Sequence, residues 1–430
     1  MSRKFEIIER QIEPLGETLY TFTLSCGLPV EMIRKRGFTK KFVSYSVDFG
    51  SDDISFIRQG DIAKTVLPFG TAHFLEHKMF EQKNTDAMSL FSAMGVNSNA
   101  GTGHTNTTFY FTCTDNFEKS LKLLMKFITD PYINDENVKK ERGIIAQEIK
   151  MYDDSPEYVC SFNMTHAMYK NNYARYDIAG KAEDIERIDA DILLRAYESF
   201  YTPENSVLTV VADLEPEYVA HLLESMNLKF KGKGVPERIF PKEPNAPDEE
   251  VVFGKMSAAK TLFSIGYKDD EKRLFAKQGL IRRPALSFAI ASAFGESSDF
   301  YSRLYGSGLI NKAFGPYNLS YRTHAYSAVE GESDDPKKVL EEIQKEIERR
   351  IANGFEEDEI RRNKNDSLGS SVAVFNNPQA IGRFLGRLKL DGIDIFDFFD
   401  GYAKISREDV AENFRIAFSV KPVLSVIEPL

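Results

Sequence analysis

The sequence has few cysteines and no long apolar run. Its three cysteines, Cys26, Cys113 and Cys160, lie far apart without the spacing of a metal site, and an odd number in a chain of 430 residues is typical of a reducing compartment. No run of about 18 or more apolar residues occurs, and the first 14 residues lack the apolar stretch of about 7 to 15 residues that a signal peptide requires. These absences predict no membrane span and a soluble, cytoplasmic protein.

The sequence also lacks an excess of positive charge. It contains 55 lysines and arginines and 65 aspartates and glutamates, which gives a net charge of −10. Phosphate binding requires a basic surface, so this balance argues against nucleic acid as the main partner and leaves room for basic peptides. With 42% hydrophobic and 28% charged residues, the composition is that of a globular protein. The length suggests about two to four domains of ordinary size.

The chemistry concentrates in residues 70–80, GTAHFLEHKMF. His73 and His77 are four residues apart, so on a helix both imidazoles lie on one face and can bind one ion, with Glu76 pointing into the same space. Thr71 is expected to cap this helix. His-x-x-Glu-His is the inverted form of the zincin motif and needs its third ligand from a distant part of the chain. Taken alone, the motif fits a solvated charged face equally well.

A second helix is predicted over residues 134–152, with an apolar stripe that includes Val138 and Ile145. It carries Glu141 and Glu148, which lie two helical turns apart and therefore face the same way. This helix is a candidate source of the missing ligand.

Together these features resemble the inverzincin metallopeptidases, the family that includes pitrilysin, insulin-degrading enzyme and mitochondrial processing peptidase. The resemblance covers most of the chain. Three further patterns follow in the family's order: Gly-x-x-x-Asn-Ala-x-Thr from Gly95 to Thr102, a Glu-Arg helix from Glu141 to Glu148, and Tyr-x-Pro-x-Asn from Tyr201 to Asn205. The segments HFLEHKMFE and EIKMYDDSPE are most similar to short, two-half members from Gram-positive bacteria, which occur beside a partly degenerate sister subunit.

The resemblance implies Glu148 as the last ligand beside His73 and His77, and one Zn²⁺ per chain. Two imidazoles and one carboxylate suit zinc and leave a fourth position for water. Glu76 is then the catalytic base and not a ligand. Glu141 is expected to orient a ligating histidine from outside the ligand set.

A stretch rich in Asn, Ser and Gly precedes a β-strand that is predicted over residues 105–114. Gly101 makes this stretch a poor interior strand and a good exposed edge, where an extended peptide can bind through its main chain. By resemblance, Asn99 and Ala100 present backbone to the substrate. We therefore predict that Asn99, Ala100, Gly101 and Thr102 bind substrate, with a plain turn as the alternative.

Domain organisation follows from a linker and an internal repeat. Residues 229–249 contain four prolines and many charges, which is typical of a domain boundary. The apolar strand pattern at 423–427 echoes the pattern at 207–211, about half a chain earlier. We predict an α+β fold of two similar halves from a duplicated unit, each an antiparallel-rich sheet packed against helices, forming half of a clamshell. The predicted parts are an N-terminal catalytic zinc domain at 1–228, the linker at 229–249 and a structurally similar C-terminal domain at 250–430.

One part of the family pattern is missing. Catalytically complete members carry in their second half an Arg and a Tyr that hold the peptide carbonyl near zinc, whereas Arg303, Tyr305 and Tyr317 are out of register here. Since an oxyanion donor is commonly worth about 3 kcal/mol, a site without this pair should be slow. The resemblance therefore implies a homologous subunit that supplies Arg and Tyr, in a heterodimer rather than a homodimer.

The sequence thus predicts a zinc-dependent endopeptidase that cleaves short or unfolded peptides in a closed chamber, as the catalytic subunit of a heterodimer that processes or degrades peptides. Two other classes stay open. One is a noncatalytic core or assembly subunit of the same fold, against which the intact His-x-x-Glu-His motif and Glu148 argue. The other is a peptide-binding protein that uses only the edge strand.

Overall fold

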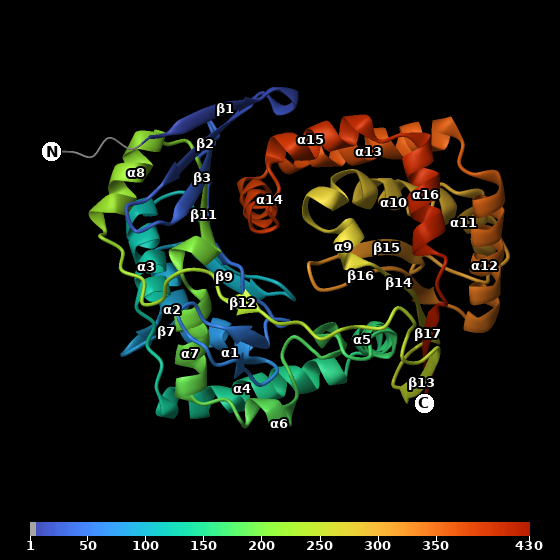
Figure 1. Ribbon diagram of the computed structural model, residues 1–430, viewed down its shortest axis with the longest axis horizontal. Coiled ribbons are helices and arrows are strands. Elements are labelled where there is room, and N and C mark those ends of the chain that lie inside the picture. The colour runs from blue at the N-terminus through green and yellow to red at the C-terminus, as the bar shows by residue number, and fades with distance from the viewer. Residues whose placement is uncertain (1–5) are drawn as a thin grey trace. The chain divides into compact units, whose positions relative to one another are not determined.

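The computed structural model describes residues 6–430, which form two compact units from interleaved segments (Figure 1). The first unit takes the described residues up to 149 together with 177–239 and 370–395, and the second takes 150–176, 240–369 and 396–430. Each half of the sequence therefore contributes a segment to the unit that the other half mainly builds. The chain leaves the first unit and enters the second at residues 239–240, which lie inside the predicted linker. The domain boundaries at 228 and 250 stay a prediction.

The first unit is built on a seven-stranded sheet with the strand order β1-β2-β3-β11-β4-β10-β9. All neighbours are antiparallel except β3 and β11. The strands are β1 (Ile8–Ile12), β2 (Glu17–Thr23), β3 (Pro29–Arg34), β4 (Lys41–Val47), β9 (Asn97–Thr102), β10 (Thr107–Cys113) and β11 (Ser206–Ala212). Two small sheets accompany it, one of β12 (Glu237–Arg238), β5 (Ser55–Ile57) and β6 (Thr65–Val66), the other of β7 (Glu81–Gln82) and β8 (Thr85–Asp86).

Helices cover both faces of this sheet. Val43 and Tyr45 of β4 point into the main hydrophobic core, whereas Phe42 points to the opposite face, because side chains alternate along a strand. Seven helices lie on the core side: α1 (Thr71–Met79), α2 (Ala87–Ala93), α3 (Phe117–Thr129), α4 (Asp135–Asp153), α6 (Ala182–Ile185), α7 (Ala190–Phe200) and α8 (Pro216–Ser225). Helix α14 (Pro378–Leu390), from the far end of the chain, packs on β4 and β11 (Figure 1).

The second unit is built on a five-stranded sheet with the order β13-β17-β14-β16-β15. Its strands are β13 (Val251–Met256), β14 (Leu262–Asp269), β15 (Gly315–Ser320), β16 (Ala325–Glu332) and β17 (Val423–Pro429). Its helices are α5 (Pro156–Met168), α9 (Glu271–Leu274), α10 (Gly279–Phe294), α11 (Asp299–Gly306), α12 (Pro336–Asn353), most of α13 (Glu357–Val374), α15 (Ile395–Lys404) and α16 (Arg407–Ala417). Helix α5 comes from the first half of the sequence and packs on β14 and β17.

The two sheets repeat one topology. The order β13-β17-β14-β16-β15 matches β3-β11-β4-β10-β9, and in both runs only the first pair of strands is parallel. Each unit also receives one helix from the other half of the sequence, and these two helices, α14 and α5, cover equivalent faces of the two sheets. Gly382 of α14 lies against Phe42 of β4, and Gly266 of β14 lies against Met164 of α5. The predicted duplication of an α+β unit with antiparallel-rich sheets is confirmed.

The proline-rich segment around the predicted linker is held along part of its length. Arg238 Nε donates to Asp53 Oδ1 at 2.8 Å, and the amide of Ile239 donates to the carbonyl of Ser55 at 2.8 Å. These contacts attach strand β12 to β5 in the first unit. Among residues 6–430, no helix combines the length and the apolar character needed to cross a lipid bilayer.

We predict that Gly382 is required for the packing of α14. A Cβ at this position would lie 2.3 Å from the Phe42 ring, which is fully buried. We expect Gly382→Ala to lower the free energy of unfolding by about 1–2 kcal/mol, because overpacking costs about 1–3 kcal/mol and the gain in helix propensity offsets at most about 1 kcal/mol. Urea unfolding measures the change.

The matched control is Gly369→Ala on α13, where nothing lies within 4 Å of the added carbon. This variant should be as stable as the parent chain or more stable by up to about 1 kcal/mol. Equal behaviour of the two variants would show that α14 tolerates the extra volume.

Candidate metal centre

Helix α1 is buried on almost every side. Of its nine residues only His73 and His77 are half-buried, while Phe74 and Leu75 are fully enclosed in the main core. The helix begins after Gly70, which has a φ of 82° and whose added Cβ would lie 2.3 Å from the carbonyl oxygen of Ala179. Glycine is therefore required at this start. The two histidines are the most exposed part of the helix.

The predicted cap of this helix is wrong. The Thr71 hydroxyl donates to the carbonyl of Pro68 at 2.7 Å, and no side chain caps α1. The hydroxyl is turned back to the preceding loop, so the backbone geometry of Gly70 starts the helix instead.

Helix α4 brings Glu148 to the two histidines. Glu148 Oε1 lies 3.6 Å from His73 Nε2, and its Oε2 lies 3.4 Å from His77 Nε2. The imidazole rings are 4.6 Å apart between centroids and inclined at 65°. One ligand atom from each of these three residues lies within 4.8 Å of the other two. The structure thus brings together the three residues that the sequence singled out as ligands.

The spacing of these atoms fits a metal ion. Both distances to Glu148 are longer than hydrogen bonds, which rarely exceed about 3.2 Å. Ligand atoms about 2.0–2.1 Å from a tetrahedral zinc ion lie about 3.3–3.4 Å from one another, close to the observed separations. His73 Nδ1 is buried and has no hydrogen-bond partner among residues 6–430. The donor set of two imidazoles and one carboxylate therefore fits zinc.

Burial keeps His73 neutral. It lowers the pKa of His73 to about 4, and the neighbouring His77 contributes in the same direction. A metal ligand must be the neutral imidazole with a free lone pair, so His73 is in the ligating form at neutral pH.

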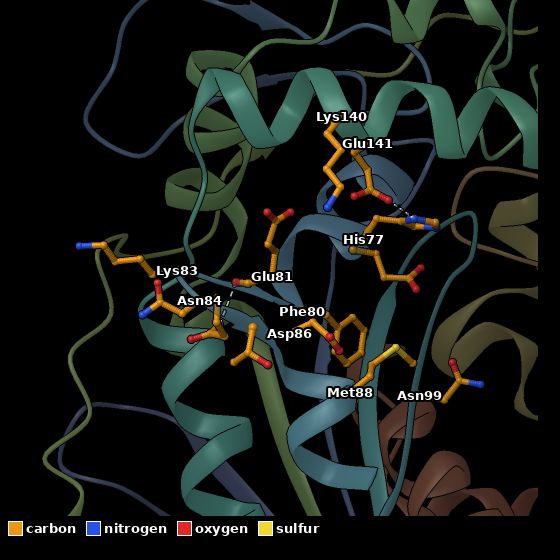
Figure 2. A pocket seen from close by; sticks show the side chains of 13 residues that line it. His77, Phe80, Glu81, Lys83, Asn84, Asp86, Met88, Asn99, Lys140 and Glu141 are labelled. Atoms are coloured by element: carbon orange, nitrogen blue, oxygen red, sulfur yellow. Dashed lines mark hydrogen bonds and ion pairs between the residues drawn. The ribbon is translucent and has the colours of Figure 1, made fainter. Parts of the chain in front are cut away.

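Glu141 holds the second histidine. Its Oε1 lies 3.1 Å from His77 Nδ1, an interaction drawn in Figure 2, which leaves Nε2 directed at Glu148. Burial lowers the pKa of His77, but the hydrogen bond to Glu141 and the charge of Glu76 outweigh it, so the pKa is raised overall. A carboxylate behind a ligating histidine fixes its tautomer and its orientation.

Glu76 is buried beside the convergent set and has its own partner. Thr102 Oγ1 donates to Glu76 Oε2 at 2.7 Å, which connects helix α1 to strand β9. Burial raises the pKa of Glu76, and the Thr102 hydrogen bond opposes this shift. A raised pKa makes a carboxylate a stronger base, which suits a group that takes and returns a proton.

Strand β9 is the edge of the seven-stranded sheet, as predicted, and within the described residues 6–430 it pairs with β10 alone. The amide of Ala100 donates to the side-chain oxygen of its neighbour Asn99 at 2.8 Å, so it is turned away from β10. Asn99 and Gly101 are exposed, whereas Thr102 is half-buried against Glu76. Whether these four residues bind substrate stays a prediction.

A cavity of about 730 Å³ opens beside His77. Glu76, His77 and Glu141 line its inner side, and Phe80 and Asn99 belong to its wall. Figure 2 shows the Glu141 carboxylate pointing to the His77 ring in this space. The cavity gives a ligand access to His77 and Glu76.

Three residues named for the second half have local roles there. Arg303 pairs with Glu342, and the Tyr317 hydroxyl donates to Glu330 Oε1 at 2.7 Å, both within the second unit. Tyr305 is exposed on α11. These contacts give none of the three the task of holding a substrate carbonyl.

Two features of the site were missed by sequence reasoning. Lys78 is completely buried and lies 3.2 Å from Glu141 Oε2, although lysine at a helix end normally reads as exposed. Thr102, which we predict to bind substrate, also donates its hydroxyl to Glu76, a contact that the sequence does not indicate. Nothing in the sequence around Lys78 or in α4 indicates the contact between Lys78 and Glu141, and nothing around Thr102 indicates its contact with Glu76.

Comparison with known proteins identifies the family. Residues 56–181 match Insulinase (Peptidase family M16), and residues 187–366 match the Peptidase M16 inactive domain. The first match contains His73, Glu76, His77, Glu141 and Glu148. The chain belongs to the M16 peptidase family, and the predicted resemblance is confirmed.

Individual relatives agree with this assignment. The Bacillus subtilis (strain 168) protein named uncharacterized zinc protease YmfH is 32% identical over 405 residues, covering 93% of this chain and 94% of that protein. An M16-like peptidase from Alicyclobacillus acidocaldarius matches with a TM-score of 0.90 and 27% identity over 100% of both chains. A protease from Helicobacter pylori, at 18% identity and a TM-score of 0.83 over 96% of this chain and 99% of that chain, shares the fold.

Proposed function

We propose that this chain is a zinc-dependent endopeptidase, with one Zn²⁺ held by His73, His77 and Glu148. The observation that carries the proposal is the convergence of two imidazole nitrogens and the two oxygens of the Glu148 carboxylate at separations suited to one ion. Relatives named zinc proteases support the choice of metal.

The chain's own residues supply the proton transfers. When bound, the ion acts as a Lewis acid toward the scissile carbonyl and a water molecule. Glu76 takes a proton from the attacking water and later returns it to the leaving amine, for which its raised pKa suits it. Thr102 holds one carboxylate oxygen of Glu76, so the other is free to meet the water. Glu141 keeps His77 in the tautomer that ligates through Nε2.

The substrate we propose is a short or unfolded peptide that adds to strand β9. The strand has an unpaired edge, and the outward amide of Ala100 is close in sequence to Thr102, which touches the base. An extended peptide that pairs with this edge would pass the metal centre with its main chain, whereas a folded protein offers no free strand of this kind. The residues proposed to bind it are Asn99, Ala100, Gly101 and Thr102.

A partner is proposed as well. No Arg and Tyr pair in the family's register occurs in the second half, so we infer that a homologous subunit supplies these groups in a heterodimer that encloses a chamber. The free cysteines favour a cytoplasmic location. We propose an N-terminal catalytic zinc domain at 1–228, a linker at 229–249 and a structurally similar C-terminal domain at 250–430.

The first test replaces the base. We expect Glu76→Gln to lower kcat on an unstructured peptide by about 10²–10⁴-fold, because the amide cannot accept the proton, while zinc content stays at one ion per chain. Glu148→Gln should lose zinc as well as activity. Peptide cleavage and metal analysis of the same samples separate the two effects.

His221→Gln on α8, an exposed histidine outside the site, is the control and should keep both properties. A Glu76→Gln protein with unchanged peptide cleavage would exclude Glu76 as the base. If the parent chain binds zinc and the Glu76→Gln variant serves the cellular role of the parent equally well, the chain is a noncatalytic subunit.

The second test removes one outward amide from the edge strand. Proline is tolerated on an edge strand where its nitrogen faces away from the ladder, which is the situation of Ala100. We expect Ala100→Pro to raise KM by about 2–10-fold, the value of one main-chain hydrogen bond, with a smaller change in kcat. Steady-state kinetics with a peptide of about ten residues measures both.

The control is Ile8→Pro, at the first residue of β1 on the opposite edge of the same sheet. It should leave KM unchanged. Equal effects of the two prolines would argue that β9 is not the binding strand.

The third test concerns the partner. We expect the chain purified alone to cleave peptides at least about 10²-fold more slowly than the chain purified with its homologous subunit, because about 3 kcal/mol of carbonyl stabilisation is missing. Zinc content should be the same in both preparations. Full activity of the chain alone would contradict the proposal of a heterodimer, whereas the proposal of a zinc site would still hold.

A further inference from the structure

Lys78 follows the second histidine of α1, and its side chain is completely buried. An ammonium group is costly to remove from water unless carboxylates and hydrogen-bond acceptors surround it. An unbranched apolar side chain would fill the same space without this cost. The presence of lysine therefore calls for a role that depends on its charge.

The Lys78 ammonium joins three segments around the metal centre. It pairs with Glu81 in β7, lies 3.2 Å from Glu141 Oε2 and donates to the carbonyl of Asn137 at 3.1 Å. Glu141 and Asn137 stand one turn apart on α4, so a single cation ties this helix to the end of α1. These are the two helices that carry His73, His77 and Glu148.

The carboxylate of Glu141 is divided between two partners. Its Oε1 faces His77 Nδ1 at 3.1 Å, and its Oε2 faces Lys78 Nζ at 3.2 Å. A carboxylate held at both oxygens cannot rotate, so the oxygen behind His77 stays in place. We propose that Lys78 is a positioning residue that fixes Glu141 and, through it, the orientation of His77 at the metal; this inference rests on the proposed function.

The charge of Lys78 has a second effect. Glu76, Glu141 and Glu148 place three carboxylates around one small site, and Lys78 directly compensates the one that is not needed as base or ligand. Without the ammonium, Glu141 Oε2 loses its cationic partner, and only the contact of Oε1 with His77 Nδ1 is left to hold the carboxylate. The charge of Lys78 thus keeps the carboxylate that orients His77 in place.

The experiment compares Lys78→Met with Lys268→Met. Lys268 is also a buried lysine, and its Nζ lies 2.6 Å from Glu243 Oε1 in the second unit. Competition with a chromophoric chelator measures zinc affinity, and thermal unfolding measures stability. We expect both variants to be less stable, but only Lys78→Met to bind zinc more weakly, by about tenfold, the lower value for loss of a group that orients a ligand.

Cobalt substitution supplies an independent readout. The visible absorption of Co²⁺ responds to the number and arrangement of its ligands, so Lys78→Met should change the spectrum and Lys268→Met should preserve it. A spectrum and a zinc affinity that are unchanged in Lys78→Met would assign Lys78 to stability alone and overturn the inference. A parent protein that binds neither metal would instead remove the proposed function.

A double-mutant cycle tests the route through Glu141. If Lys78 acts through this carboxylate, the combination of Lys78→Met with Glu141→Gln should weaken zinc binding no more than Glu141→Gln alone. Additive losses would show that Lys78 does not act through Glu141. Should Lys78→Met fail to fold, Lys78→Gln keeps a donor for the Asn137 carbonyl and takes its place in both measurements, with the same results deciding.

Discussion

The structure depends on the burial of one short helix. Helix α1 is enclosed by the core of the first unit, and its start requires Gly70 because the Ala179 carbonyl leaves no room for a side chain. A helix of nine residues is marginal on its own, so this packing supplies its stability. Its register is fixed as a consequence. His73 and His77 cannot turn away from the space they face without disturbing Phe74 and Leu75, which are fully buried between them.

The site is an arrangement of carboxylates with different tasks. Glu148 faces both imidazoles, Glu141 stands behind one of them, and Glu76 is held by a threonine of the edge strand. Their neighbours keep the tasks distinct. Burial favours a protonated Glu76, whereas hydrogen bonds from His77 and the charge of Lys78 outweigh burial and lower the pKa of Glu141. Two glutamates of one small site thus have their pKa values shifted in opposite directions by their neighbours.

Much of this arrangement was predictable from local patterns. The four-residue spacing of the histidines, the common face of Glu141 and Glu148, and the weakness of a glycine-containing strand are properties of helix and strand geometry. The contacts of Lys78 and Thr102 were not predictable, because they join segments that are distant in sequence. Thr71 fails as a cap for a related reason: its hydroxyl finds the Pro68 carbonyl, which propensity alone does not anticipate. The amphipathic pattern of α14 indicates a buried face but does not say which sheet covers it.

The exchange of α5 and α14 between the repeated units has a consequence for biosynthesis. The strands of the first sheet are all translated by residue 212, yet the helix that shields Phe42 and its neighbours begins only at Pro378. Throughout the intervening translation, one apolar surface of that sheet has no native cover and is open to chaperones or to wrong pairing. The exchange of helices between the repeated units therefore ties completion of the first unit to translation of the second half, so the sheet beside the candidate metal centre stays uncovered on one face until α14 has been made.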